Sequence, residues 1–118
     1  MSCLIVDDNS LFLESASDLL RREGLDVVGV ASSSAEAIRL VTELRPDVTL
    51  VDIDLGDEDG FELAQRLHAL SGGSKVILVS THAEEDLAHL IAGSHALGFI
   101  AKARLSAQAI RDTLDRAA

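Results

Sequence analysis

Short apolar runs alternate with longer amphipathic segments along the chain. The runs cover residues 3–6, 26–31, 48–53, 75–80 and 97–101, and they are rich in aliphatic and β-branched residues. Runs this short are typical of buried strands and do not provide enough residues for a helix. The pattern therefore predicts five strands.

The segments between these runs carry apolar residues at helical spacing. They cover residues 10–23, 34–45, 60–71, 83–94 and 106–117. The segment 83–94 is weakly amphipathic, which indicates either a mobile helix or simply a short one. Helix starts are indicated by Asn9 or Ser10, Ser34, Asp59 and Ser106, and helix ends by Gly24 and the sequence RPD at 45–47. We therefore expect five helices.

The regular alternation of strands and helices decides the fold class. It requires parallel pairing through right-handed crossovers, with helices on both faces of the sheet. The expected fold is α/β, a doubly wound five-stranded parallel sheet with the flavodoxin-like strand order 2-1-3-4-5. No repeat or linker interrupts the 118 residues, so one domain is expected over 1–118.

Composition and charge narrow the function classes. The net charge of -10 argues against direct binding of nucleic acid or an anionic membrane, because Lys and Arg carry such binding. The single Cys3 excludes an internal disulfide, fits a reducing compartment and is expected in the core. The sequence has neither a long apolar run nor a cationic leader, so we predict a cytoplasmic protein.

Carboxylates end two strands that the predicted order makes neighbours. Ligands of such sheets bind beyond the carboxyl ends of the strands, where the strand order reverses. Asp7 and Asp8 follow the first strand and Asp52 ends the third. At ~4 Å and an effective dielectric of ~20, each close pair repels by roughly 4 kcal/mol. Bound Mg²⁺ would offset this repulsion, so we predict a magnesium site.

Two further polar residues are expected on the same rim. Ser80 ends the fourth strand and Lys102 follows the fifth. A hydroxyl and a cation beside a metal-bound carboxylate can stabilise a phosphoryl group, whose oxygens need neutralisation during transfer. Asp52 would then act as a nucleophile and form an acyl phosphate.

Each of these residues also has a structural interpretation. Asp7 and Asp8 alone would favour a turn and a helix cap, but their convergence with Asp52 favours a site. Ser80 and Lys102, taken singly, fit a capping hydroxyl and a surface amine equally well. The acids Asp57, Glu58 and Asp59 are interpreted as a solvated loop without chemistry. The histidines lack metal-binding spacing, so surface positions are expected for His68, His82, His89 and His95. Of these, His82 alone could face the rim.

Four stretches resemble the signatures of a known family. "LIVDDN" at 4–9, "VDIDLGDEDG" at 51–60, "VILVSTHA" at 76–83 and "GFIAK" at 98–102 are similar to those of bacterial response-regulator receiver domains. The stretch "GFIAKARLSAQAI" at 98–110, with Ala103 after the Lys, resembles receivers fused to helix-turn-helix outputs. The resemblance implies that Asp52 is the phosphoacceptor. It further implies a Mg²⁺ site formed by Asp7, Asp8, Asp52 and the backbone carbonyl of Asp54. Ser80 would hydrogen-bond the phosphoryl group, Lys102 would pair with it, and Phe99, otherwise a core residue, would be the aromatic switch residue.

The resemblance also implies partners. A sensor histidine kinase or a small phosphodonor would supply the phosphoryl group, and phosphorylation would promote a homodimer or act on a fused or separate output domain that controls transcription. That output domain is not expected within these residues. The chain is not expected to be an enzyme beyond its own phosphorylation and dephosphorylation.

The chain departs from the family pattern at three positions. Gly56 stands where Pro is usual, which predicts a more flexible loop after Asp52. Ala103 replaces the Pro that often follows the Lys, so a trans peptide is expected before it. Thr81 is larger than the usual residue and is expected to narrow access to the phosphoryl group.

Two other functions remain open at this point. The sequence DID at 52–54 resembles the nucleophile motif of Mg²⁺-dependent aspartate-nucleophile phosphohydrolases, although in that family the motif lies on the first strand of a larger chain. The other is an interaction module that works without phosphorylation and has kept the acids.

Overall fold

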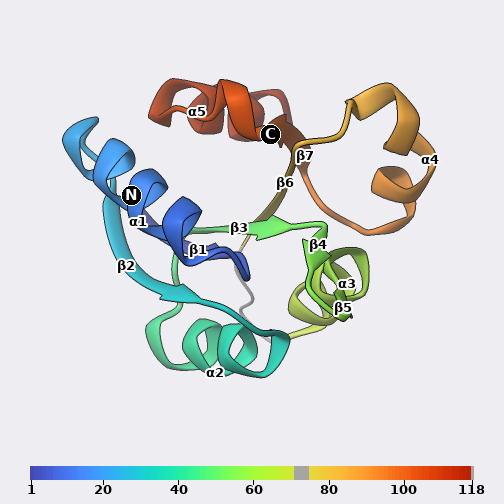
Figure 1. The fold of residues 1–118 in the computed structure, drawn as a ribbon, viewed down its shortest axis with the longest axis horizontal. Helices are drawn as coiled ribbons and strands as arrows, with labels where there is room; N and C mark the ends of the chain where they lie inside the picture. Colours follow the sequence, from blue (N-terminus) through green and yellow to red (C-terminus); the bar gives the residue numbers. More distant parts are fainter. Residues whose placement is uncertain (71–74, 118) are drawn as a thin grey trace.

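Five parallel strands form the central sheet of the computed structural model, which describes residues 1–70 and 75–117. The strand order is β2-β1-β3-β6-β7 (Figure 1). This is the predicted order 2-1-3-4-5, so the predicted fold class is confirmed. The strands are β1 Ser2–Val6, β2 Asp26–Ala31, β3 Val48–Asp52, β6 Lys75–Ser80 and β7 Gly98–Ala101.

Helices cover both faces of this sheet. In Figure 1, α1 and α5 lie on one face and α2 and α3 on the other, while α4 lies beside β7. Helix boundaries agree with the predicted ones to within two residues; residue 71, the predicted end of the third helix, lies outside the described residues. The helices are α1 Ser10–Arg22, α2 Ser34–Leu44, α3 Gly60–Ala69, α4 Glu84–Gly93 and α5 Ala107–Ala117.

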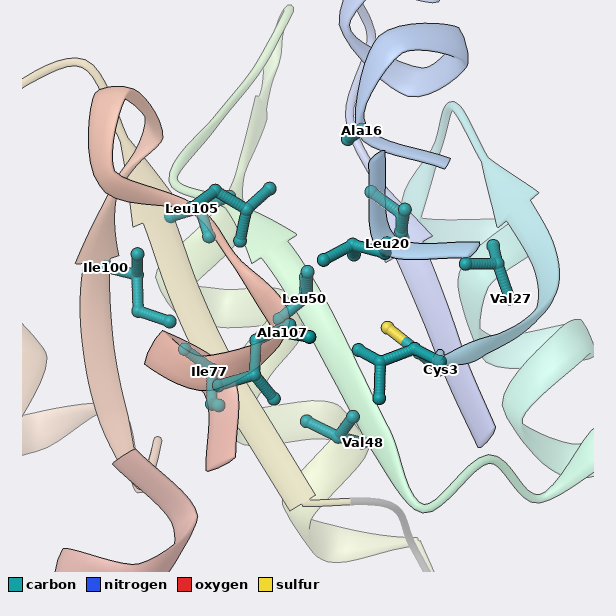
Figure 2. Packing of buried hydrophobic residues seen from close by; sticks show 14 of the residues in the cluster. Cys3, Ala16, Leu20, Val27, Val48, Leu50, Ile77, Ile100, Leu105 and Ala107 are labelled. Carbon is teal, nitrogen blue, oxygen red and sulfur yellow. The ribbon is translucent and has the colours of Figure 1, made fainter. Parts of the chain in front are cut away.

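The sheet separates two apolar cores. Successive side chains of a strand point to opposite faces, so Ile5 joins the core beneath α1 and α5, whereas Leu4 joins the core beneath α2 and α3. This explains why the strands read as continuous apolar runs rather than as alternating ones. Figure 2 shows the first core, in which Leu50 and Ile77 of two central strands contribute side chains with no exposed surface.

Cys3 belongs to the first core, as predicted. Its side chain is fully buried and the thiol is free (Figure 2). Burial raises the pKa of this thiol to about 12, because the thiolate would lose its hydration. Cys3 therefore behaves as a small apolar side chain.

Three predicted helix caps are confirmed and one is wrong. First-turn N–H groups of α1, α3 and α5 donate to side-chain oxygens of Asn9, Asp59 and Ser106. Ser33, not Ser34, caps α2, since Ser33 Oγ lies 3.2 Å from the N–H nitrogen of Glu36. Because both residues are serine, the sequence does not distinguish which of them is the cap. The extended backbone at Ser33 (φ -147°) makes it the cap.

The loop after β3 contains a short hairpin that the sequence did not predict. Strands β4 Asp54–Leu55 and β5 Glu58–Asp59 pair antiparallel. Gly56, at the tip, has φ 61°, which Pro cannot adopt because its ring fixes φ near −65°. The tip of the hairpin therefore has a backbone conformation that glycine adopts without strain.

Helix α4 is attached to the body less extensively than the other helices. None of the described residues of α4 is buried, and Ala83 provides no side-chain cap at its start. Leu87 and Ile91 are partly buried against the second core. The chain then enters β7 and the 3-10 turn η1 Lys102–Arg104, where the peptide bond before Ala103 is trans, as predicted. Among the described residues, no helix has the length and apolar character needed to cross a bilayer.

Candidate functional site

Three carboxylates meet at the carboxyl ends of β1 and β3. These strands are neighbours in the sheet. Carboxylate oxygens of Asp7, Asp8 and Asp52 all lie within 4.8 Å of one another. Asp7 is fully buried and Asp52 is 4% exposed, whereas Asp8 faces solvent. The predicted proximity of the two strand ends is therefore confirmed.

Lys102 projects into this cluster from the turn after β7. Its Nζ lies 2.6 Å from Asp7 Oδ2 and 3.2 Å from Asp52 Oδ2. The same ammonium group lies 4.3 Å from the ring centroid of Phe12 on α1, a cation–π contact. Phe12 was not predicted as a site residue. The available signal was an aromatic residue, scarce in this chain, in the first turn of the helix that follows the acidic pair.

The cluster shifts the pKa of two of its members. Burial raises the pKa of Asp52 to about 6, and the charge of Asp7 adds to the shift. The hydrogen bond from the Asp54 N–H to Asp52 Oδ1, 3.1 Å long, and the charge of Lys102 act in the opposite direction. Burial lowers the pKa of Lys102, but its contacts with Asp7 and Asp52 outweigh burial and leave the pKa above its usual value. Lys102 is therefore a cation at neutral pH.

The residues of the cluster fit a divalent cation. Asp7 Oδ2 is buried and accepts no well-directed hydrogen bond, although the Lys102 ammonium group lies close to it. One ammonium group does not balance three carboxylates in a partly buried site. Oxygen ligands of this kind suit Mg²⁺, which binds through one or two carboxylates and keeps several waters.

Ser80 and Phe99 lie on the adjoining strands. Ser80 is fully buried at the end of β6, where its Oγ accepts a hydrogen bond of 2.9 Å from the His82 N–H. Phe99 on β7 is 9% exposed and belongs to the second core. Asp52 pairs with Val79 in the ladder between β3 and β6, which places Ser80 just beyond the Asp52 level of the sheet.

His82 lies at the rim of the site, a position that the sequence left open for this histidine alone. Its Nε2 is 3.3 Å from Asp54 Oδ2, and both side chains are exposed. Thr81, beside it, is exposed as well. The other histidines are also exposed, as expected, and the rings of His68 and His95 stack with centroids 4.7 Å apart.

Two residues near the site have roles that were not predicted from the sequence. Glu58, interpreted as a solvated carboxylate, accepts a hydrogen bond of 3.0 Å from the Ser34 N–H at the start of α2. Gly60 lies against β3, where a Cβ atom would collide with the backbone oxygen of Asp52. Neither role has a local sequence signal, because each depends on contacts made only in the fold.

Comparisons with known proteins agree with the geometry. A family model described as response regulator receiver domain matches residues 3–115. The transcriptional regulatory protein NarL of Mycobacterium tuberculosis is 30% identical over 113 residues, which cover 95% of this chain and 52% of that protein. The solved signal receiver domain of NarL from Mycobacterium tuberculosis superimposes with a TM-score of 0.84 at 29% identity, covering 98% of this chain and 94% of that one.

A second kind of relative shares the same region. The protein-glutamate methylesterase/protein-glutamine glutaminase of Halobacterium salinarum is 34% identical over 83 residues, which cover 70% of this chain but 24% of that protein. The chain thus spans about half or less of the length of these curated relatives.

Proposed function

Because this chain belongs to the response regulator receiver domain family, we propose that Asp52 accepts a phosphoryl group and that this charge switches a protein-interaction surface. The observation that carries the proposal is the meeting of Asp7, Asp8 and Asp52 within 4.8 Å of one another, with Lys102 in contact with two of them. These are the groups needed to bind a phosphoryl dianion on a carboxylate.

Asp52 is the proposed nucleophile. A carboxylate oxygen of Asp52 attacks the phosphorus of the donor, the new O–P bond forms an acyl phosphate, and the bond to the leaving group breaks. With a phosphohistidine donor the N–P bond breaks and the imidazole leaves; with acetyl phosphate, acetate leaves. Asp52 is ionised, and hence nucleophilic, above its pKa of about 6.

Asp7, Asp8, Asp52 and the backbone carbonyl of Asp54 are the proposed Mg²⁺ ligands. The bound ion would neutralise charge on the phosphoryl oxygens. Lys102 already contacts Asp52 Oδ2 and would pair with a phosphoryl oxygen with little movement. The Ser80 hydroxyl would donate a further hydrogen bond, since its proton has no acceptor among the described residues.

The switch is proposed to pass through Ser80 and Phe99. Phosphorylation adds about −1.5 to −2 charge, which attracts the Ser80 hydroxyl and with it the loop leading to α4. Because α4 has no buried residue, a small change in this loop can alter its packing on Phe99. Phe99 lines a surface cavity of about 570 Å³ between α4, β7 and α5, so its repacking would change that surface. This is a population shift between two packings.

The partners follow from family membership. We place the chain in the cytoplasm, with a sensor histidine kinase as the proposed phosphoryl donor and a homodimer or an output domain as the target of the switch. Similarity to NarL favours transcription as the output, exerted by another domain because the net charge of -10 disfavours DNA contact here.

Intact mass after incubation with acetyl phosphate and Mg²⁺ tests the proposal. The native chain should gain one phosphoryl group, and Asp52→Asn should gain none. Asp57→Asn is the matched control, since it removes an exposed carboxylate a few residues away and should be labelled like the native chain. Labelling of Asp52→Asn would refute the assigned acceptor; an unlabelled native chain that still binds Mg²⁺ would instead indicate an interaction module independent of phosphorylation.

A further inference from the structure

The β4–β5 hairpin connects the acidic site to α2. We propose that Glu58 is a positioning residue: it holds this hairpin against the start of α2 and thereby sets the Mg²⁺ affinity of the site. The inference rests on the proposed function, because it takes the Asp54 carbonyl as a metal ligand. Glu58 itself does not reach the metal site; it acts through the hairpin backbone.

The contact made by Glu58 is specific. Its Oε1 accepts a hydrogen bond of 3.0 Å from the N–H of Ser34, the first residue of α2 and 24 residues away in sequence. N–H groups in the first turn of a helix have no partner within the helix, and the helix dipole favours a carboxylate there. Ser33 satisfies the N–H of Glu36, so Glu58 supplies a second, separate acceptor for the start of α2.

The hairpin transmits this contact to the site. Glu58 pairs with Leu55, and Asp59 pairs with Asp54. The Asp54 N–H in turn donates to Asp52 Oδ1. A displacement of Glu58 therefore displaces Asp54, which contributes both this hydrogen bond and the proposed carbonyl ligand.

The tip of the hairpin also lies against the metal site. A Cβ atom on Gly56 would lie 3.3 Å from Asp8 Oδ2. The hairpin thus approaches two of the three carboxylates, Asp52 through the Asp54 N–H and Asp8 through its tip. A shift of the hairpin would change the spacing of the ligand set as a whole.

The hairpin needs contacts with the rest of the fold because few residues pair between its two strands. An isolated two-stranded hairpin is marginally stable at best, and this one has two residue pairs. The contacts that hold it to the rest of the fold include the buried Leu55, which is 2% exposed, and the Glu58 hydrogen bond. Loss of groups that orient metal ligands typically costs about 10–100-fold in metal affinity, and we expect the lower end for an effect passed through the backbone.

Mg²⁺ binding to the 118-residue chain, measured by isothermal titration calorimetry well above the Asp52 pKa, tests this role. Glu58→Ala should weaken binding about tenfold. Glu58→Gln keeps an acceptor oxygen and should stay within about twofold, since a distant exposed charge is largely screened. Asp57→Asn removes a charge from the same hairpin; its side chain has no hydrogen bond or ion pair among the described residues, so binding should again stay within about twofold.

Ser34→Pro provides an independent variant from the other side of the contact. Proline is favoured at the first position of a helix, and it removes the N–H that Glu58 accepts while Glu58 remains intact. Binding should weaken as in Glu58→Ala. Thermal unfolding without metal shows whether each variant is folded at the titration temperature, which separates a positioning role from general destabilisation.

Three results would decide against the inference. If Glu58→Ala and Ser34→Pro bind Mg²⁺ as tightly as Asp57→Asn does, the contact between Glu58 and Ser34 does not position the site. Glu58→Gln as weak as Glu58→Ala would show that charge, not the hydrogen bond, matters. Absence of Mg²⁺ binding by the native chain would overturn the proposed metal site itself, which distinguishes that failure from failure of the Glu58 role.

Discussion

Replacement of Asp52 by Asn is expected to stabilise the metal-free protein at neutral pH. The pKa of Asp52 rises from 3.8 to about 6 on folding, chiefly because the carboxylate is buried. The folded state therefore favours the protonated form, and the stability that this form contributes is lost as the pH rises through about 6. One pKa unit corresponds to about 1.4 kcal/mol, so the ionised carboxylate costs roughly 3 kcal/mol.

Asn removes this cost because it preserves the shape of the side chain without its charge. We expect the free energy of unfolding to rise by about 2–3 kcal/mol at about pH 7.5 in the presence of a chelator, which corresponds to roughly 10 °C in Tm for a domain of this size. At about pH 4 both side chains are largely neutral in the fold, and the difference should nearly vanish.

Urea unfolding at the two pH values, with and without Mg²⁺, measures these differences. Mg²⁺ at 100 times the dissociation constant should largely cancel the difference at neutral pH, because the ion adds about 2.7 kcal/mol to a chain that retains the full ligand set. The reasoning would be refuted if Asp52→Asn were no more stable than the native chain without metal. A gain of equal size at about pH 4 would likewise show that charge is not its cause.

Three further outcomes are expected. Gly60→Ala should destabilise the chain by at least about 2 kcal/mol, since its Cβ would collide with the Asp52 backbone oxygen. Gly93→Ala is the control, because a Cβ there meets nothing within 4 Å. Equal urea midpoints for the two variants would contradict the expectation. Ser33→Ala should cost about 1 kcal/mol in unfolding free energy as a lost helix cap, and a larger loss for Ser34→Ala would reassign the cap. Calorimetric Mg²⁺ affinity should fall as the pH drops through about 6, because protons compete for Asp52; a flat profile would contradict this.

The topology of the site could be predicted because it follows from the order of strands. Alternating apolar runs and amphipathic segments allow few arrangements, and the doubly wound order places the ends of β1 and β3 side by side. Asp7, Asp8 and Asp52 were identified as a cluster for this reason alone. Lys102 and Ser80 followed because parallel strands end at the same edge of a sheet.

Contacts between side chains and distant backbone could not be predicted. Glu58 reaches α2 because the β4–β5 hairpin turns it there, and that hairpin depends on the left-handed backbone at Gly56. Phe12 meets the Lys102 ammonium group, 4.3 Å from its ring centroid, across 90 residues of sequence, a contact made only in the fold. Sequence periodicity sets the buried face of an element, but it does not fix such contacts or the path of a loop.

The buried thiol makes the chain convenient for site-specific labelling. Alkylating reagents react with the thiolate, which Cys3 does not form near neutral pH because its pKa is about 12. A cysteine introduced at the exposed Ala88 of α4 would therefore react alone, without removal of the native one. The chain has no Trp or Tyr, so a fluorophore attached there would report on the surroundings of α4 without intrinsic background emission from those residues.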